Sequence, residues 1–389
     1  MAHGRSHGKP RRTPREKNRE KNREKNRGKN RGKNRGKNRE KTPLTLAATA
    51  ALALTCALAL ALTLGGTTGA AAAVPTPTPG ELRPYDIEST YVSGVSSGGY
   101  LADHLHVAHS AVFKGAGIFS AGAYDCAQGS VNTALYACMD TYMPRKTPAQ
   151  LEQLTRERAA AGRVDPVANL SGDPVWLYHG GNDRTVDRPV NDDLAAYHRD
   201  FGANVSYDTS SPAGHAWVSP LGKVPCATTA SPYVNTCGTD PERAMLTHLF
   251  GAPVNPASTA PLDGTLVRFD QNRHVPGGNA AAVSMGKDGF AYVPKACADG
   301  SGGSCRLMVA LHGCQQTYGQ IGDTFMSQAY LNEYADTNRM IVLYPQATTA
   351  LDNPRGCWNW WGYGGDTHYA DKSGKQITAI MSMVRQLGG

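Results

Sequence analysis

Short runs of apolar residues recur through residues 85–389, and each run is followed by turn-forming residues. The clearest are PVWLYHG from Pro174, RLMVALHG from Arg306 and MIVLYPQ from Met340. These runs are rich in Val, Ile, Leu and Tyr and do not alternate strictly with polar residues, which is typical of buried parallel strands. We therefore expect three strands of a parallel sheet at these positions.

Helical patterns lie between and after these runs. AQLEQLTRERAAAG and DDLAAYHRDFG can both form helices, and the second ends at Gly202, a residue type that often terminates a helix. The last residues place Ile377, Ile380, Met381 and Val384 at helical spacing, which predicts a closing helix. Strands that alternate with helices predict an α/β fold, with a mostly parallel sheet covered by helices on both faces. Residues 85–389 are enough for one such domain.

The charge of the chain is concentrated at its N-terminus. Residues 1–42 contain 18 Lys and Arg and 4 Glu, in a repeat of REKN and RGKN, and this composition predicts a disordered basic tail. Because the whole chain is +8 and this tail is +14, the remaining residues sum to −6. A mildly acidic domain lacks the basic face that nucleic-acid binding needs, so we expect no nucleic-acid partner for it.

An uncharged apolar segment follows the tail. Residues 44–64 carry no charge, and small residues then lead to Ala71, Ala72 and Ala73. A charged region, an apolar region and an Ala-x-Ala site predict a signal peptide over residues 43–73, with cleavage after Ala73 and export of the rest. The apolar run also reaches the roughly 20 residues that span a bilayer, so an uncleaved signal-anchor is the alternative. Residues 74–84 are rich in Pro and Thr, and we expect a linker there.

The cysteine content agrees with export. Apart from Cys56 inside the apolar segment, which we interpret as inert, eight cysteines remain, and an even number in an exported chain predicts disulfides. No CxxC motif occurs, which argues against a zinc site. Short loops favour three pairs, which leaves one long-range pair: Cys126–Cys138, Cys226–Cys237, Cys297–Cys305 and Cys314–Cys357.

The stretch YVSGVSSGGY contains the motif Gly-x-Ser-x-Gly, with Ser96 at its centre. Strand-like residues precede the motif and a helical pattern follows it, and in that context the motif predicts a sharp turn that exposes a nucleophilic serine. The Ser97 N–H, at the start of the helix, can then face an oxyanion.

A serine nucleophile needs a base, and the base needs an acid that orients it. Asp183 follows the strand at Pro174, with Asp187 as its rival, and His215 lies in a later loop. The order Ser, Asp, His is that of α/β-hydrolases. His104, His106 and His109 follow the serine at spacings that do not share one helix face, so we interpret them as structural and not as metal ligands.

The second oxyanion donor normally follows an earlier strand, but little chain precedes Ser96. The segment RLMVALHGCQQ ends a strand in His-Gly-Cys and can supply that donor through the Cys314 N–H. If it does, the first strands of the fold have moved to the C-terminus. The sequence therefore predicts a circularly permuted α/β-hydrolase fold.

Several blocks resemble extracellular poly(3-hydroxybutyrate) depolymerases of the single-domain, circularly permuted type. They are the segment from Ser93 to Gly129, LMVALHGCQQTYGQIGD, ADTNRMIVLYPQ and GCWNWWGYGG. The resemblance implies a triad of Ser96, Asp183 and His215, an oxyanion hole from the Ser97 and Cys314 amides, and no metal or cofactor. Common bacterial members add a linker and a polymer-binding domain, whereas this sequence stops at Gly389.

The resemblance also implies that a tryptophan of the CWNWW block lies in the substrate cleft. Aromatic faces suit an uncharged, methyl-bearing polyester, so Trp358, Trp360 and Trp361 are candidates, with Trp358 as the first choice. We expect a secreted, monomeric serine esterase that contacts a membrane only if the signal segment is uncleaved. The alternatives are a feruloyl or acetylxylan esterase and a membrane-anchored polymer-binding protein without activity.

Overall fold

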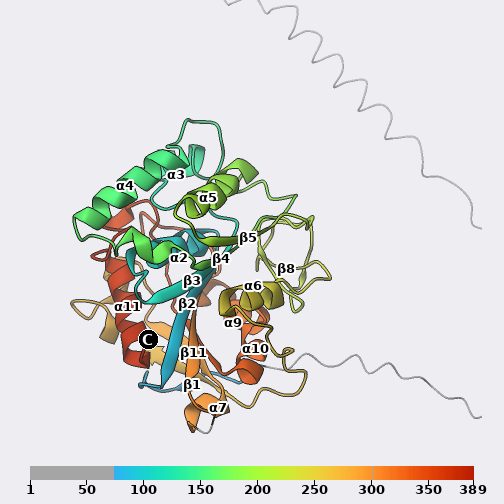
Figure 1. The fold of residues 1–389 in the computed structure, drawn as a ribbon. Helices are drawn as coiled ribbons and strands as arrows, with labels where there is room; N and C mark the ends of the chain where they lie inside the picture. The colour runs from blue at the N-terminus through green and yellow to red at the C-terminus, as the bar shows by residue number, and fades with distance from the viewer. Residues whose placement is uncertain (1–73, 301) are drawn as a thin grey trace, which may run out of the picture. The chain divides into compact units, whose positions relative to one another are not determined.

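A nine-stranded, mostly parallel sheet forms the centre of the computed structural model, which describes residues 74–300 and 302–389 (Figure 1). Only β10 runs antiparallel to its neighbours within this sheet. In order across the sheet, the strands are β1 (Thr78–Pro79), β9 (Thr265–Asp270), β10 (Asp288–Val293), β12 (Met340–Tyr344), β11 (Cys305–Leu311), β2 (Ile87–Val95), β3 (Phe113–Phe119), β4 (Pro174–Tyr178) and β5 (Asn204–Asp208).

The sheet is buried on both faces, because alternate side chains of its central strands enter two different cores. On β11, Leu307, Val309 and Leu311 point into one core, and Met308 and Ala310 point into the other. The first core is covered by α2 (Ser97–Ala108), α3 (Val131–Tyr136), α4 (Pro148–Ala160), α5 (Arg188–Asp200) and α11 (Lys375–Leu387), and the second by α6 (Pro241–Phe250), α9 (Thr324–Gln328) and α10 (Leu331–Asn338) (Figure 1). The predicted α/β architecture is confirmed, including the three apolar runs as β4, β11 and β12.

The strand order also confirms the circular permutation. Strands β9 to β12 come last in the chain, yet they lie on one side of β2, the first long strand, and β11 pairs with it directly. In this parallel pairing, Leu311 lies beside Gly94, so the His-Gly-Cys segment and the serine motif leave the sheet at the same edge.

Shorter elements complete the domain. A small second sheet joins β6 (Trp217–Val218), β8 (Val234–Thr236) and β7 (Val224–Pro225). The remaining helices are α7 (Lys295–Ala298), α8 (Tyr318–Ile321) and the short 3-10 helices at Val167–Leu170, Gln271–His274, Ala280–Val283 and Tyr363–Gly365.

The Pro/Thr-rich segment that we expect to be a linker packs against the domain. Strand β1 pairs with β9, Gly80 N–H donates to the Arg268 carbonyl at 3.0 Å, and the Leu82 side chain is buried. The folded part therefore begins before Tyr85. The sequence pattern misled here because proline, which cannot donate a hydrogen bond within a central strand, is tolerated at a sheet edge.

The basic tail and the signal segment, including Cys56, lie outside the described residues. Within residues 74–300 and 302–389, no helix combines the length and apolarity needed to cross a membrane. The eight cysteines of the described region form the four bonds that their spacing predicts, namely Cys126–Cys138, Cys226–Cys237, Cys297–Cys305 and Cys314–Cys357.

Candidate active site

Ser96 lies in the turn between β2 and α2. Its φ of 57° and ψ of −124° form a backbone conformation that residues other than glycine rarely adopt. The flanking glycines permit the turn, because a Cβ on Gly94 would lie 2.3 Å from the Gly98 carbonyl oxygen. A Cβ on Gly98 would lie equally close to the Leu311 carbonyl oxygen, at 2.3 Å. The glycines thus let α2 approach both β2 and β11, and the serine is left at the edge of the sheet.

His215 and Asp183 form a buried pair beside this turn. The Nδ1 atom of His215 lies 2.7 Å from Oδ2 of Asp183, and the two side chains come from the loops after β5 and β4. Oδ1 of Asp183 accepts hydrogen bonds from the N–H groups of Thr185 (2.8 Å) and Val186 (3.0 Å). Asp183 is therefore fixed on both oxygens and can orient the imidazole.

The rival carboxylate, Asp187, does not reach the imidazole. It occupies the N-cap position of α5, and its Oδ2 atom accepts a hydrogen bond from the Thr141 hydroxyl at 3.1 Å. The three residues between the two aspartates separate a turn that faces His215 from the start of a helix.

Backbone hydrogen bonds join the aspartate turn to the histidine loop. Gly181 N–H donates to the Ser211 carbonyl at 2.8 Å, and Asn182 N–H donates to the Ala213 carbonyl at 2.9 Å. His215 N–H in turn donates to the Thr229 hydroxyl at 2.9 Å, in a loop closed by the Cys226–Cys237 disulfide. The distance between carboxylate and imidazole is therefore set by rigid main-chain contacts.

Burial alone would raise the pKa of Asp183, but its surroundings lower it. The charge and hydrogen bond of His215 and the two backbone N–H groups together outweigh the desolvation of the carboxylate. Asp183 is therefore ionised across the neutral range, and its negative charge can stabilise an imidazolium.

The His-Gly-Cys segment runs beside Ser96. A Cβ on Gly313 would lie 3.4 Å from the Cβ of Ser96, and Cys314 lines the same cleft as the serine. Burial lowers the pKa of His312 to about 4, so this imidazole is neutral. Its Nδ1–H donates to the Gly313 carbonyl at 2.7 Å, and its Nε2 accepts a hydrogen bond from Ala347 N–H at 3.1 Å. His312 therefore holds the loop in shape.

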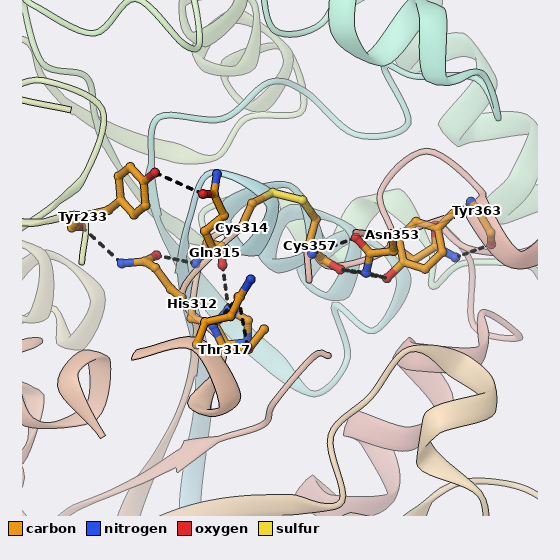
Figure 2. Close-up of a disulfide and its surroundings, with 12 residues drawn as sticks. Tyr233, His312, Cys314, Gln315, Thr317, Asn353, Cys357 and Tyr363 are labelled. Atoms are coloured by element: carbon orange, nitrogen blue, oxygen red, sulfur yellow. Dashed lines mark hydrogen bonds between the residues drawn. A yellow bond between two sulfur atoms is a disulfide. The ribbon is translucent and has the colours of Figure 1, made fainter. Parts of the chain in front are cut away.

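The disulfide Cys314–Cys357 ties this loop to the tryptophan-rich block (Figure 2). Beyond the disulfide, the Asn353 side chain accepts from Cys357 N–H at 2.9 Å and donates to its carbonyl at 2.8 Å. Tyr363 donates to the same carbonyl at 2.8 Å. Cys314 is thus anchored to the loop that carries Cys357.

The cleft has two lobes that meet at Ser96. The histidine lobe encloses about 220 Å³, and its lining includes Ser96, Thr185, His215, Tyr233, Gly313, Cys314, Gln315, Gln316 and Arg355. The tryptophan lobe encloses about 310 Å³, and its lining includes Ser96, Tyr100, Val131, Leu135, Met139, Cys314, Arg355, Trp360 and Trp361. Ser96, Met139, Cys314 and Arg355 line both lobes.

The three candidate tryptophans have different positions, and the preference for Trp358 is wrong. Trp358 is fully buried, packs 5.2 Å from the His312 ring and lines neither lobe. Trp360 and Trp361 do line the tryptophan lobe, and Trp360 stacks on Tyr100 with ring centres 3.8 Å apart. Three aromatic residues so close in sequence give no periodicity that separates the cleft from the core.

Sequence reasoning missed three polar or aromatic contributors. Gln316 accepts from Gly313 N–H at 2.7 Å and donates to the Pro232 carbonyl at 2.9 Å, which links the His-Gly-Cys loop to the Tyr233 loop. Tyr100 follows the serine motif directly, and Arg355 lies two residues before Cys357. Proximity to motif residues was the only signal available for each of them.

The three histidines after the serine do not converge on one point. His104 accepts from the Asp125 N–H at 3.2 Å, whereas His106 lies 3.0 Å from Asp173. Burial lowers the pKa of His109 to about 4. Among the described residues, no cluster of His, Cys, Asp and Glu is suited to hold a metal.

The parallel strands bring these groups to one edge of the sheet, since Ser96, Asp183, His215 and Cys314 all follow carboxyl ends. A strained serine between strand and helix, with an imidazole–carboxylate pair in the same cleft, defines the α/β-hydrolase class. No family model matches the chain. Relatives and solved structures, however, assign it more narrowly.

A poly(3-hydroxybutyrate) depolymerase of Delftia acidovorans is 40% identical over 304 residues, which are 77% of this chain and 59% of that protein. A polyhydroxybutyrate depolymerase of Talaromyces funiculosus is 37% identical over 317 residues, which cover 77% of this chain and 89% of that protein. The chain therefore belongs to the poly(3-hydroxybutyrate) depolymerase family.

Solved structures agree with this assignment. A serine-to-alanine variant of a PHB depolymerase, complexed with an R3HB trimer, has a TM-score of 0.71 at 33% identity and covers 79% of this chain and 98% of that one. The crystal structure of PHB depolymerase from Penicillium funiculosum has a TM-score of 0.70 with the same identity and coverage.

Proposed function

We propose that this protein is an exported serine esterase that hydrolyses poly(3-hydroxybutyrate) to short 3-hydroxybutyrate products. The observation that carries the proposal is the meeting of the strained Ser96 with the His215–Asp183 pair in one cleft. The names of the relatives supply the substrate class. Residues 85–389 are proposed as the catalytic domain, preceded by the edge strand β1.

In the proposed mechanism, His215 accepts the proton of the Ser96 hydroxyl as its oxygen attacks an ester carbonyl. The Ser97 and Cys314 N–H groups stabilise the oxyanion, and neither donates to another group of the described residues. The imidazolium, stabilised by Asp183, then protonates the departing alkoxide and leaves an acyl-enzyme. His215 next activates a water molecule that releases the acid and restores Ser96.

The tryptophan lobe suits an uncharged polyester chain. Its walls combine the Tyr100–Trp360 stack with Trp361, Val131, Leu135 and Met139. Methyl and methylene groups gain free energy from contact with such walls, at about 25 cal/mol for each Å² of apolar surface removed from water.

An apolar rim extends from this lobe onto the surface. Within the part of the chain that the structure describes, the exposed large apolar side chains are Val131, Leu135, Tyr136, Tyr142, Met143 and Leu351. Two of them line the lobe, and Leu351 precedes Asp352 of its lining. Exposed apolar groups gathered beside one cleft mark an interaction site. We assign this rim to contact with the surface of the solid polymer.

Export is supported by the four disulfides and by the sequence pattern of residues 43–73. A cleaved protein is released into the culture medium, whereas an uncleaved signal-anchor keeps the protein in the membrane. The mass of the protein recovered from the medium therefore tests cleavage after Ala73.

The central test replaces Ser96 with alanine. Ser96→Ala should lower turnover of amorphous polymer and of a soluble butyrate ester by roughly 10⁴-fold or more, because alanine has no hydroxyl that can form the acyl-enzyme. Ser97→Ala is the matched control: its hydroxyl is buried without a partner among the described residues, and the variant keeps the backbone N–H. Near-normal activity of Ser96→Ala would refute the proposal. Release of ferulate or acetate from xylan without clearing of polymer would assign the site to a carbohydrate esterase.

A further inference from the structure

One positively charged side chain lines a cleft that is otherwise suited to an uncharged substrate. Arg355 borders both lobes, and its side chain is the only Lys or Arg among their lining residues in the described chain. Its guanidinium has no carboxylate partner within the described residues. Asp352, the nearest acid in sequence, instead accepts from Gly364 N–H at 2.7 Å.

The backbone at Arg355 is fixed although its side chain is exposed. Its carbonyl accepts from Gln315 N–H at 2.7 Å, which joins it to the residue after Cys314. Gly356 N–H donates to the Asn353 carbonyl at 3.1 Å, and the Cys314–Cys357 disulfide closes the same loop. The guanidinium is therefore held at the mouth of the cleft by its main chain and not by its own hydrogen bonds.

Gln315 adds a second donor beside this arginine. The Tyr233 hydroxyl donates to Oε1 of Gln315 at 3.4 Å, so the amide nitrogen of Gln315 is the end left free to donate (Figure 2). Gln315 and Tyr233 both line the histidine lobe. Arg355 and Gln315, joined through their main chains, thus both contribute side-chain donors to the lining of the histidine lobe, which includes no Asp or Glu.

We infer that Arg355 and Gln315 form a subsite for the terminal carboxylate of a short 3-hydroxyacid oligomer. The inference rests on the proposed esterase activity and specifies which chain end that site prefers. A neutral ester carbonyl in the middle of a polymer gains little from a guanidinium, whereas a carboxylate forms charge-assisted and often bidentate hydrogen bonds with it.

The chemistry of cleavage places that carboxylate on the histidine side. His215 gives its proton to the departing alkoxide, so the departing unit occupies the histidine lobe. When the last ester bond is cleaved, the bond between the acyl carbon and the alkoxide oxygen breaks, and the acyl group stays on Ser96. The departing unit is then 3-hydroxybutyrate, whose carboxyl carbon is three covalent bonds from the new hydroxyl oxygen.

The subsite predicts preferential release of the carboxyl-terminal unit from soluble oligomers. Soluble oligomers, in which a chain end is always near the cleaved bond, are then bound through this subsite. The polymer is bound instead through the tryptophan lobe and the apolar rim. Arg355 is then a specificity-determining residue, and it takes no part in proton transfer.

The test compares a 3-hydroxybutyrate trimer as the free acid with the same trimer as its carboxyl-terminal methyl ester. Assays are run at mildly alkaline pH, where the acid is ionised. We expect Arg355→Gln to lower the ratio of kcat/KM for acid over ester about tenfold or more, because a charge-assisted bond to the carboxylate is lost. Gln315→Glu should lower the same ratio through repulsion, and Arg355→Lys should retain part of it.

Arg273→Gln is the matched control, since it removes the same charge from a residue that lines neither lobe. This control should leave the ratio unchanged. The carboxylate subsite would be overturned if Arg355→Gln lost activity by the same factor on both trimers, or if it lost activity on neither trimer. Either outcome would leave the proposed esterase intact. Failure of the wild-type protein to hydrolyse either trimer would overturn the subsite, and failure on amorphous polymer as well would overturn the proposed esterase.

Discussion

The two lobes of the cleft are built by different kinds of contact. In the histidine lobe, the reacting groups are held by directional hydrogen bonds, such as His215 to Asp183 at 2.7 Å and Gly313 to Gln316 at 2.7 Å. In the tryptophan lobe, the walls are held by ring stacking, such as Tyr100 on Trp360, and continue into an exposed apolar rim. Chemistry needs atoms at fixed distances, whereas polymer binding needs apolar area that many side chains can provide.

This comparison predicts that changes to the reacting groups of the histidine lobe, and to the contacts that hold them, reduce kcat on every ester. Changes at the apolar rim should reduce turnover of solid polymer only. The predictions below test that division, in order of decreasing effect.

Asp183→Asn should cause a large loss, roughly 10³- to 10⁴-fold in kcat on a soluble ester, since an amide no longer holds the imidazole in the required tautomer. Initial rates over a range of substrate concentrations measure it. Asp187→Asn is the control, because Asp187 bonds Thr141 and does not reach His215. A greater loss in Asp187→Asn than in Asp183→Asn would reverse the assignment of the acid.

Removal of the Cys314–Cys357 disulfide should have an intermediate effect. In Cys314→Ser with Cys357→Ser, the Cys314 N–H loses its anchor to the loop that carries Cys357, and we expect kcat to fall roughly tenfold. Unfolding free energy should fall by about 2–5 kcal/mol. Kinetics well below the melting temperature and thermal denaturation measure the two effects separately.

The matched control removes Cys297–Cys305, which lies at the start of β11 and away from the cleft lining. This pair of substitutions should lower stability with little change in kcat. If the Cys314–Cys357 variant also kept its kcat, the disulfide would serve stability alone.

Substitutions at the apolar rim should have the smallest effect and the most selective one. Tyr142 is 86% exposed and Leu351 is fully exposed, and neither lines a lobe. Tyr142→Ser with Leu351→Ser should reduce clearing of a polymer suspension several-fold through lost apolar contact, with an unchanged rate on a soluble ester. Equal loss on both substrates would argue against a separate polymer-contacting surface.

The sequence predicted well wherever the structure depends on local geometry. The Gly-x-Ser-x-Gly motif carries its own turn, because a Cβ on Gly94 would lie 2.3 Å from the Gly98 carbonyl oxygen. Strand-end positions indicated Asp183, His215 and Cys314, since carboxyl ends of parallel strands share one edge of a sheet. The disulfide spacing also predicted all four bonds.

Only the tertiary structure separated Trp358 from Trp360 and Trp361, because residues two or three positions apart in an irregular loop have no pattern that tells core from cleft. It also distinguished edge strand β1 from a linker and brought Arg355 beside Gln315 across 40 positions of sequence. The chain by itself determined which residues have reactive groups and which turns they occupy, since both follow from local backbone sterics. Which of those residues share a cleft was decided by packing between distant segments, which no local pattern encodes.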